Sequence, residues 1–168
     1  MSRARRLLPM LALAFILIAI VLNFAARNEP IGIDFHTYAA AAEVGLEQGW
    51  PNIYDQGRVA VQQKILVPGE VAQPFLSPPT VAWLVAAFEP LPYELSFYIW
   101  AVLTLVAFAA ALAWAAYSRG VDRWILVAAA VAPWWVLEAA RVGQVVPLVA
   151  AALAVSWRLL RNDRNVAA

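Results

Sequence analysis

The feature that most limits the fold of this chain is the uncharged apolar run from Leu95 to Tyr117. A helix rises about 1.5 Å per residue, so a run of this length covers the roughly 30 Å hydrocarbon core of a membrane. The composition agrees, because 64% of the 168 residues are hydrophobic and only 14% are charged. Soluble domains are nearer half apolar and a quarter charged. The sequence therefore predicts an all-α integral membrane protein.

Three further apolar segments are predicted to be spans, at residues 7–26, 124–137 and 145–160. The first is longer than the core of a cleaved signal peptide, about 7–15 residues, so we favour an uncleaved anchor over that alternative. The run from Thr80 to Phe88 is too short to cross a bilayer, and we expect an interfacial or re-entrant helix there, with Pro79 in its first turn. About four spans in a single membrane domain, residues 1–168, are predicted.

The charges indicate how these spans are oriented. Most basic residues lie near the two termini and in the loop at 118–123, whereas most acids lie within residues 27–92 or near the later turn at 138–144. Lys and Arg are enriched in cytoplasmic loops. We therefore expect a multi-pass protein of the cytoplasmic (inner) membrane with both termini in the cytoplasm and residues 27–92 as a long external loop.

Two segments of this external loop have predictable local structure. Apolar residues recur at helical spacing between Asp34 and Gln48, which predicts an amphipathic helix on the outer membrane surface, stopped by Gly49 and Pro51. The segment Gln73–Pro79 contains three prolines, which fix their own φ and restrain the residues before them. We expect this segment to be stiff and extended.

A set of short motifs follows one another around this loop: Asp34-Phe35-His36-Thr37-Tyr38, Tyr54-Asp55, Phe75-Leu76-Ser77-Pro78-Pro79, Pro90-Leu91-Pro92 and Gly143-Gln144-Val145-Val146. In this order they resemble the N-terminal part of a GT-C glycosyltransferase, and more narrowly family 87, the polyprenol-phosphate-mannose-dependent mannosyltransferases. Members of that family typically carry an aromatic residue before Pro-Pro, where this chain has Leu76-Ser77. They are also longer, so the resemblance covers the N-terminal module of the family, without the C-terminal helices that complete its active site.

The resemblance implies a membrane glycosyltransferase that moves a sugar, mannose in this family, from a polyprenyl phosphate to an acceptor hydroxyl on the outer face of the cytoplasmic membrane. The acceptor oxygen needs a general base, and a carboxylate can take its proton. The position of the family's catalytic Asp is filled here by Asp34. The alternative for Asp34 is a helix N-cap, a position that Asp favours.

Three residues of the external loop are candidate substrate-binding residues. His36 suits a donor phosphate or a sugar hydroxyl, or it is an interfacial His without a ligand. Tyr38 and Tyr54 suit stacking on a sugar, or they anchor the loop at the membrane interface. For Tyr54 we favour anchoring.

Two residues of the later turn are further substrate-binding candidates. Arg141, with Gln144, suits the donor phosphate, because a guanidinium matches phosphate geometry. Its alternative partner is Glu138, three residues earlier on the same helix face.

The remaining expectations concern cofactors and partners. A single His and the lack of Cys argue against a His-rich or thiolate metal centre, and the family is metal-independent, so no metal and no cofactor are expected. The expected partners are the polyprenyl-phosphate donor, a glycan or glycolipid acceptor, membrane lipids and a second chain that supplies missing helices, but no nucleic acid. The alternative function is that of a non-catalytic membrane protein, either a subunit of a larger assembly or an inactive remnant. On either interpretation the isolated chain is expected to show little transferase activity.

Overall fold

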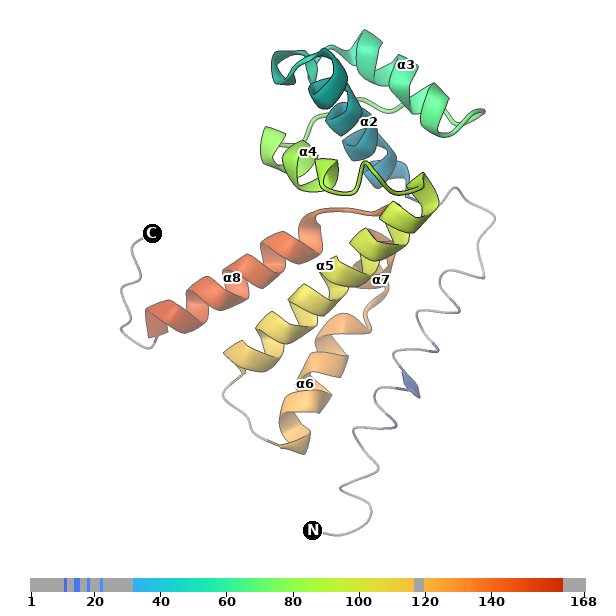
Figure 1. Cartoon of the computed structure of the whole chain (residues 1–168). Coiled ribbons are helices and arrows are strands. Elements are labelled where there is room, and N and C mark those ends of the chain that lie inside the picture. Colours follow the sequence, from blue (N-terminus) through green and yellow to red (C-terminus); the bar gives the residue numbers. More distant parts are fainter. Residues whose placement is uncertain are drawn as a thin grey trace. The chain divides into compact units, whose positions relative to one another are not determined.

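The structure, a computed structural model, describes residues 32–116 and 120–161 and a few single positions between residues 11 and 22. Its described residues form helices and loops and contain no strand, which confirms the all-α prediction for this part of the chain. The helices, labelled in Figure 1, are α2 (Ile33–Gln48), the short 3-10 helix η1 (Trp50–Asn52), α3 (Gln56–Leu66), α4 (Pro79–Ala86), α5 (Tyr93–Ala115), α6 (Val121–Val131), α7 (Trp134–Val142) and α8 (Val146–Arg161).

These helices belong to two compact units. The first, which we call the α2 unit, comprises Glu29–Val102 and Val142–Gln144. The second, the α8 unit, includes Leu103–Arg141 and α8. Helix α5 contributes its first ten residues to the α2 unit and the rest to the α8 unit.

Helix α2 is the centre of the α2 unit and packs against η1, α3 and α4. It ends at Gln48 before Gly49, whose φ is 97°, as predicted, and it begins at Ile33, one residue before the predicted start at Asp34. The prediction of an amphipathic surface helix is wrong, because buried residues occupy several faces of α2, among them Phe35, Ala40 and Val44. The run of four alanines in its middle explains this, since small side chains let neighbouring elements approach from more than one direction.

Helix α3 holds the extended segment that follows it. The Gln63 amide donates to the carbonyl oxygen of Gln73 (2.6 Å) and accepts from its backbone N–H (2.8 Å). The Gln56 amide, seven positions earlier, does the same with the backbone of Phe75, at 3.1 and 3.0 Å. Two glutamine side chains thus substitute for a neighbouring strand. This pairing supports the extended geometry predicted from the prolines.

Helix α4 begins at Pro79, as the sequence predicts, and helix α5 has a mean hydropathy of 2.2 over its most apolar window. Among the described residues α5 is long and apolar enough to cross a membrane by itself. The bent pair of α6 and α7 is either a broken span or a re-entrant loop. Helix α8 has 16 residues, and the segment 7–26 lies outside the continuously described residues. The prediction of four spans is therefore not confirmed.

The predicted span at 124–137 needs a correction. Helices α6 and α7 meet at a bend of 62° next to Pro133. Proline lacks a backbone N–H and its ring clashes with the carbonyl one turn earlier, which breaks the helix. The predicted polar turn at 138–144 is also too long, because α7 continues to Val142 and the turn starts at Gly143.

Candidate active site

The first turn of α2 presents Asp34. The helix is preceded by Gly32, whose φ of 77° is left-handed, and Asp34 is the second helical residue. Asp34 is therefore not the N-cap, and that alternative is wrong. Its side chain is half-buried, while its backbone carbonyl accepts a hydrogen bond from the Thr37 hydroxyl at 2.8 Å. A carboxylate in the first turn interacts favourably with the helix dipole.

Aromatic rings fix the direction of this turn. The fully buried ring of Phe35 lies 5.7 Å from the ring of Tyr93, 5.9 Å from Phe97 and 6.0 Å from Trp100, all three on α5. These spacings fall within the range in which aromatic pairs attract one another. Asp34 is thus half exposed, and the residue next to it, Phe35, is held in place by three aromatic rings.

The turn at Gly143 packs against Phe35 as well. The indole N–H of Trp100 donates to the carbonyl oxygen of Gly143 at 2.8 Å. A Cβ atom added to Gly143 would lie 2.5 Å from Cβ of Phe35. The structure therefore places the half-buried Gln144 one residue from the contact that holds the first turn of α2.

His36 is occupied by the protein itself. Its side chain is 2% exposed, and its ring meets the Tyr93 ring edge-on at 5.8 Å. Nε2 lies 2.7 Å from the carbonyl oxygen of Gln63, which can only accept, so this nitrogen carries a proton and donates it. Nδ1 lies 3.4 Å from a carboxylate oxygen of Glu70. In this arrangement neither ring nitrogen is available to a donor phosphate or a sugar hydroxyl.

The two candidate tyrosines share a contact with Phe75. Tyr38 is buried, with ring contacts of 6.3 Å to both Phe75 and Trp100. Tyr54 is about half exposed, stacks at 5.5 Å on Phe75 and donates its hydroxyl hydrogen to the carbonyl oxygen of Ser77 at 2.9 Å. Both rings thus help to anchor the extended segment, and Tyr54 presents the more accessible aromatic surface.

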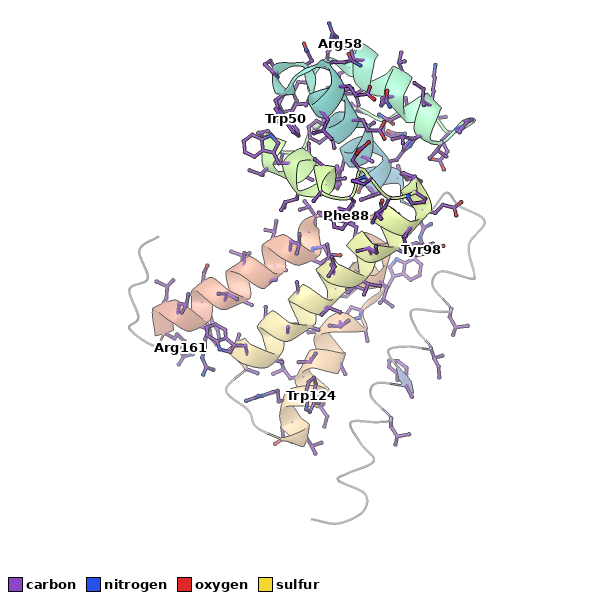
Figure 2. The ribbon with its side chains drawn as sticks, viewed as in Figure 1. Trp50, Arg58, Phe88, Tyr98, Trp124 and Arg161 are labelled. Atoms are coloured by element: carbon purple, nitrogen blue, oxygen red, sulfur yellow. The ribbon has the colours of Figure 1, made fainter. Side chains whose placement is uncertain are left out.

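Asp55 has a capping role. Its Oδ1 accepts from the backbone N–H groups of Gly57 and Arg58, and its Oδ2 lies 3.1 Å from Nε of Arg58. The backbone hydrogen bond from Arg58 is the largest cause that lowers the pKa of Asp55 below its ordinary value. Arg58 is labelled in Figure 2 on the first turn of α3. Asp55 is therefore the N-cap of α3.

Arg141 lies in the α8 unit, on α7. Its guanidinium is buried and contacts both carboxylate oxygens of Glu138, through Nη2 at 2.6 Å and Nε at 3.0 Å. The alternative partner named from the sequence is thus present. The structure brings Asp34, His36, Tyr38, Tyr54 and Gln144 into one unit and places Arg141 in the other.

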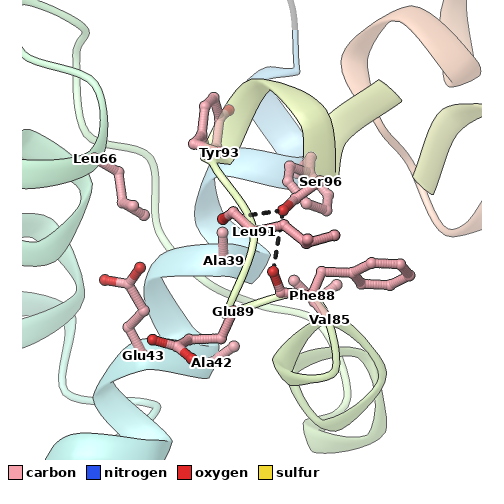
Figure 3. Close-up of a pocket in the computed structure, with 11 residues that line it drawn as sticks. Ala39, Ala42, Glu43, Leu66, Val85, Phe88, Glu89, Leu91, Tyr93 and Ser96 are labelled. Atoms are coloured by element: carbon pink, nitrogen blue, oxygen red, sulfur yellow. Dashed lines mark hydrogen bonds between the residues drawn. The ribbon is translucent and has the colours of Figure 1, made fainter. Parts of the chain in front are cut away.

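Sequence reasoning missed a partly open pocket in the α2 unit, whose empty space of about 340 Å³ includes some open solvent. It lies among α2, the end of α3, α4 and the first turn of α5. Figure 3 shows Glu43 and Glu89 at one side of it and Tyr93 and Ser96 at the other. The i, i+3, i+4 spacing of Ala39, Ala42 and Glu43 was the available signal, but Glu89 is 46 positions away along the chain. Asp34 is not among its lining residues.

The chain was compared with known proteins. The profile of glycosyltransferase family 87 matches residues 75–168, more than half of the chain. No curated protein and no solved structure gives a significant match. The matched stretch contains Arg141 and Gln144 and begins after Asp34 and His36. Members of this family are membrane proteins with glycosyltransferase activity. The family resemblance is thereby confirmed, and the chain belongs to glycosyltransferase family 87.

Proposed function

We propose that this chain transfers a sugar, mannose, from a polyprenyl-phosphate donor to a glycan or glycolipid acceptor on the outer face of the cytoplasmic membrane. Glycosyl transfer follows from the family. The observation that carries the proposed mechanism is the position of Asp34, a half-buried carboxylate on the first turn of a helix whose next residue, Phe35, is clamped by three aromatic rings.

In the proposed step the acceptor hydroxyl oxygen attacks the anomeric carbon of the donor sugar. Asp34 takes the hydroxyl proton as the new bond forms, and the polyprenyl phosphate leaves with the electron pair of the bond that breaks. General-base assistance of this kind contributes about 10²–10⁴-fold in rate when the base is fixed in position. The packing of Phe35 provides that fixation.

Arg141 and Gln144 remain the proposed contacts of the donor phosphate. Arg141 is already balanced by Glu138, so a phosphate would have to compete with that carboxylate. Gln144 follows the Gly143 turn that packs on Phe35, which supports a place for it near Asp34. Tyr54, half exposed, is the better placed of the two tyrosines to stack on a sugar.

The test compares Asp34→Asn with Asp55→Asn in the full-length protein in its native membrane. Asparagine keeps the shape of Asp34 but cannot take the acceptor proton, so turnover should fall by at least about a hundredfold. Asp55→Asn should cost far less, because Asn also caps helices. Turnover is measured with a lipid-linked sugar at matched protein levels. If Asp34→Asn keeps most of its activity, the proposed mechanism fails.

A further inference from the structure

The pocket of the α2 unit has a polar lining with one chemical character. Its polar side chains are Glu43, Glu89, Tyr93 and Ser96. The Ser96 hydroxyl hydrogen is directed at backbone carbonyls, with the carbonyl oxygen of Phe88 nearest at 3.1 Å. The Tyr93 hydroxyl points its hydrogen at the carbonyl oxygen of Gly32 at 3.4 Å. Because both hydroxyl hydrogens are already used within the protein, these four side chains can only accept hydrogen bonds from a ligand.

Glu43 is the more buried of the two carboxylates. Its Oε2 accepts a hydrogen bond from the Gln62 side chain, which leaves Oε1 without a hydrogen bond among the residues that the structure describes. Burial raises the pKa of Glu43, the Gln62 hydrogen bond opposes this, and the charges of Glu47 and Glu89 add to the increase. A ligand that donates a hydrogen bond to this carboxylate would compensate for part of its lost hydration.

The rest of the lining is apolar and includes Phe35, Phe88 and Leu91. The pocket is partly open to solvent, and its empty space of about 340 Å³ includes part of that solvent. Carboxylate and hydroxyl acceptors beside apolar walls suit a ring that donates from several hydroxyls and presents C–H surface between them. Two carboxylates would repel a phosphate.

A hard divalent cation is the rival occupant. Ca²⁺ takes about six to eight oxygen ligands, and Mg²⁺ keeps an octahedral shell. Among the described residues no group of three or more His, Cys, Asp or Glu is arranged to hold a metal ion. The apolar walls further limit the number of oxygens that could reach a cation.

We propose that this pocket binds an uncharged sugar ring of the acceptor, with Glu43 and Glu89 accepting hydrogen bonds from its hydroxyls. The assignment to the acceptor rests on the proposed function, because the donor sugar carries the phosphate that two carboxylates disfavour. Glu43 is here a binding residue, distinct from the base Asp34.

The test measures binding of methyl α-mannopyranoside to the full-length protein in lipid nanodiscs by saturation-transfer NMR. Glu43→Gln should weaken binding by about tenfold or more, since hydrogen bonds to a charged group are the stronger ones. Glu47→Gln is the matched control: Glu47 is exposed, lies one turn further along α2, and does not line the pocket. It should leave binding unchanged.

Two further variants keep the test decisive. If Glu43→Gln fails to fold, Glu89→Gln at an exposed position should weaken binding in the same way. Asp34→Asn should leave sugar binding intact, so the failure of the proposed mechanism and the failure of this site give different results. Equal binding by wild type, Glu43→Gln and Glu89→Gln would overturn the proposal. So would displacement of the sugar by Mg²⁺ or by inorganic phosphate.

Discussion

Gly143→Ala tests the contact that fixes the first turn of α2. Gly143 has a φ of 80°, and an alanine there would place its Cβ 2.5 Å from Cβ of Phe35 and 3.1 Å from its backbone nitrogen. Neither atom belongs to a flexible side-chain end, so α2 and the turn must move apart. This movement also strains the hydrogen bond from Trp100 to the Gly143 carbonyl.

Two effects contribute to the loss of stability expected for Gly143→Ala. A left-handed backbone costs a residue with a Cβ about 1–2 kcal/mol. Overpacking adds about 1–3 kcal/mol. The sum, roughly 2–5 kcal/mol, corresponds to a decrease of about 5–20 °C in Tm for a chain of this size.

The control is Gly69→Ala, because Gly69 has a φ of 95° and an added Cβ there would meet nothing within 4 Å. It shares the backbone strain and lacks the clash. Both variants are melted in detergent with tryptophan fluorescence as the signal. If Gly143→Ala lowers the Tm no more than Gly69→Ala, the close approach of Gly143 to Phe35 does not stabilise the fold.

Three further predictions concern the α2 unit and the topology. His36→Ala should lower the free energy of unfolding by about 2–4 kcal/mol, because it leaves the Gln63 carbonyl buried without its donor. A variant that loses sugar-transfer activity but keeps its stability would instead indicate that His36 contacts a ligand. Since the folded pKa of Glu43 is raised, its ionised form costs stability above that pKa and the cost disappears as the pH falls. Glu43→Gln should therefore raise the Tm more at pH 8 than at pH 5, and an equal shift would contradict this. Single cysteines at Lys64 and Asn162 test the orientation of the chain in the membrane. A membrane-impermeant thiol reagent should label the cysteine at position 64 in intact cells. If only the cysteine at position 162 is labelled, the predicted topology is wrong.

Part of this structure could be predicted from local signals. Proline fixed the start of α4 at Pro79, Gly49 fixed the end of α2, and the long uncharged run predicted α5. These signals act within one or two turns of backbone, so no knowledge of neighbouring elements is needed. The bend at Pro133 and the start of α3 at Asp55 follow from equally local rules on proline and helix capping, and both were overlooked.

The sequence by itself determined the helical class, the family and the position of Asp34 at the start of a helix. The tertiary structure decided that α2 is enclosed, that His36 is occupied by Gln63 and Glu70, and that Glu43 and Glu89 line one pocket. Each of these features joins residues that are distant along the chain, and Glu43 and Glu89 are separated by 46 positions. Such contacts depend on how several helices pack together, and side-chain periodicity within one helix does not specify its neighbours. The spacing of apolar residues in α2 therefore predicted a surface helix, whereas packing against η1, α3 and α4 makes α2 the centre of its unit.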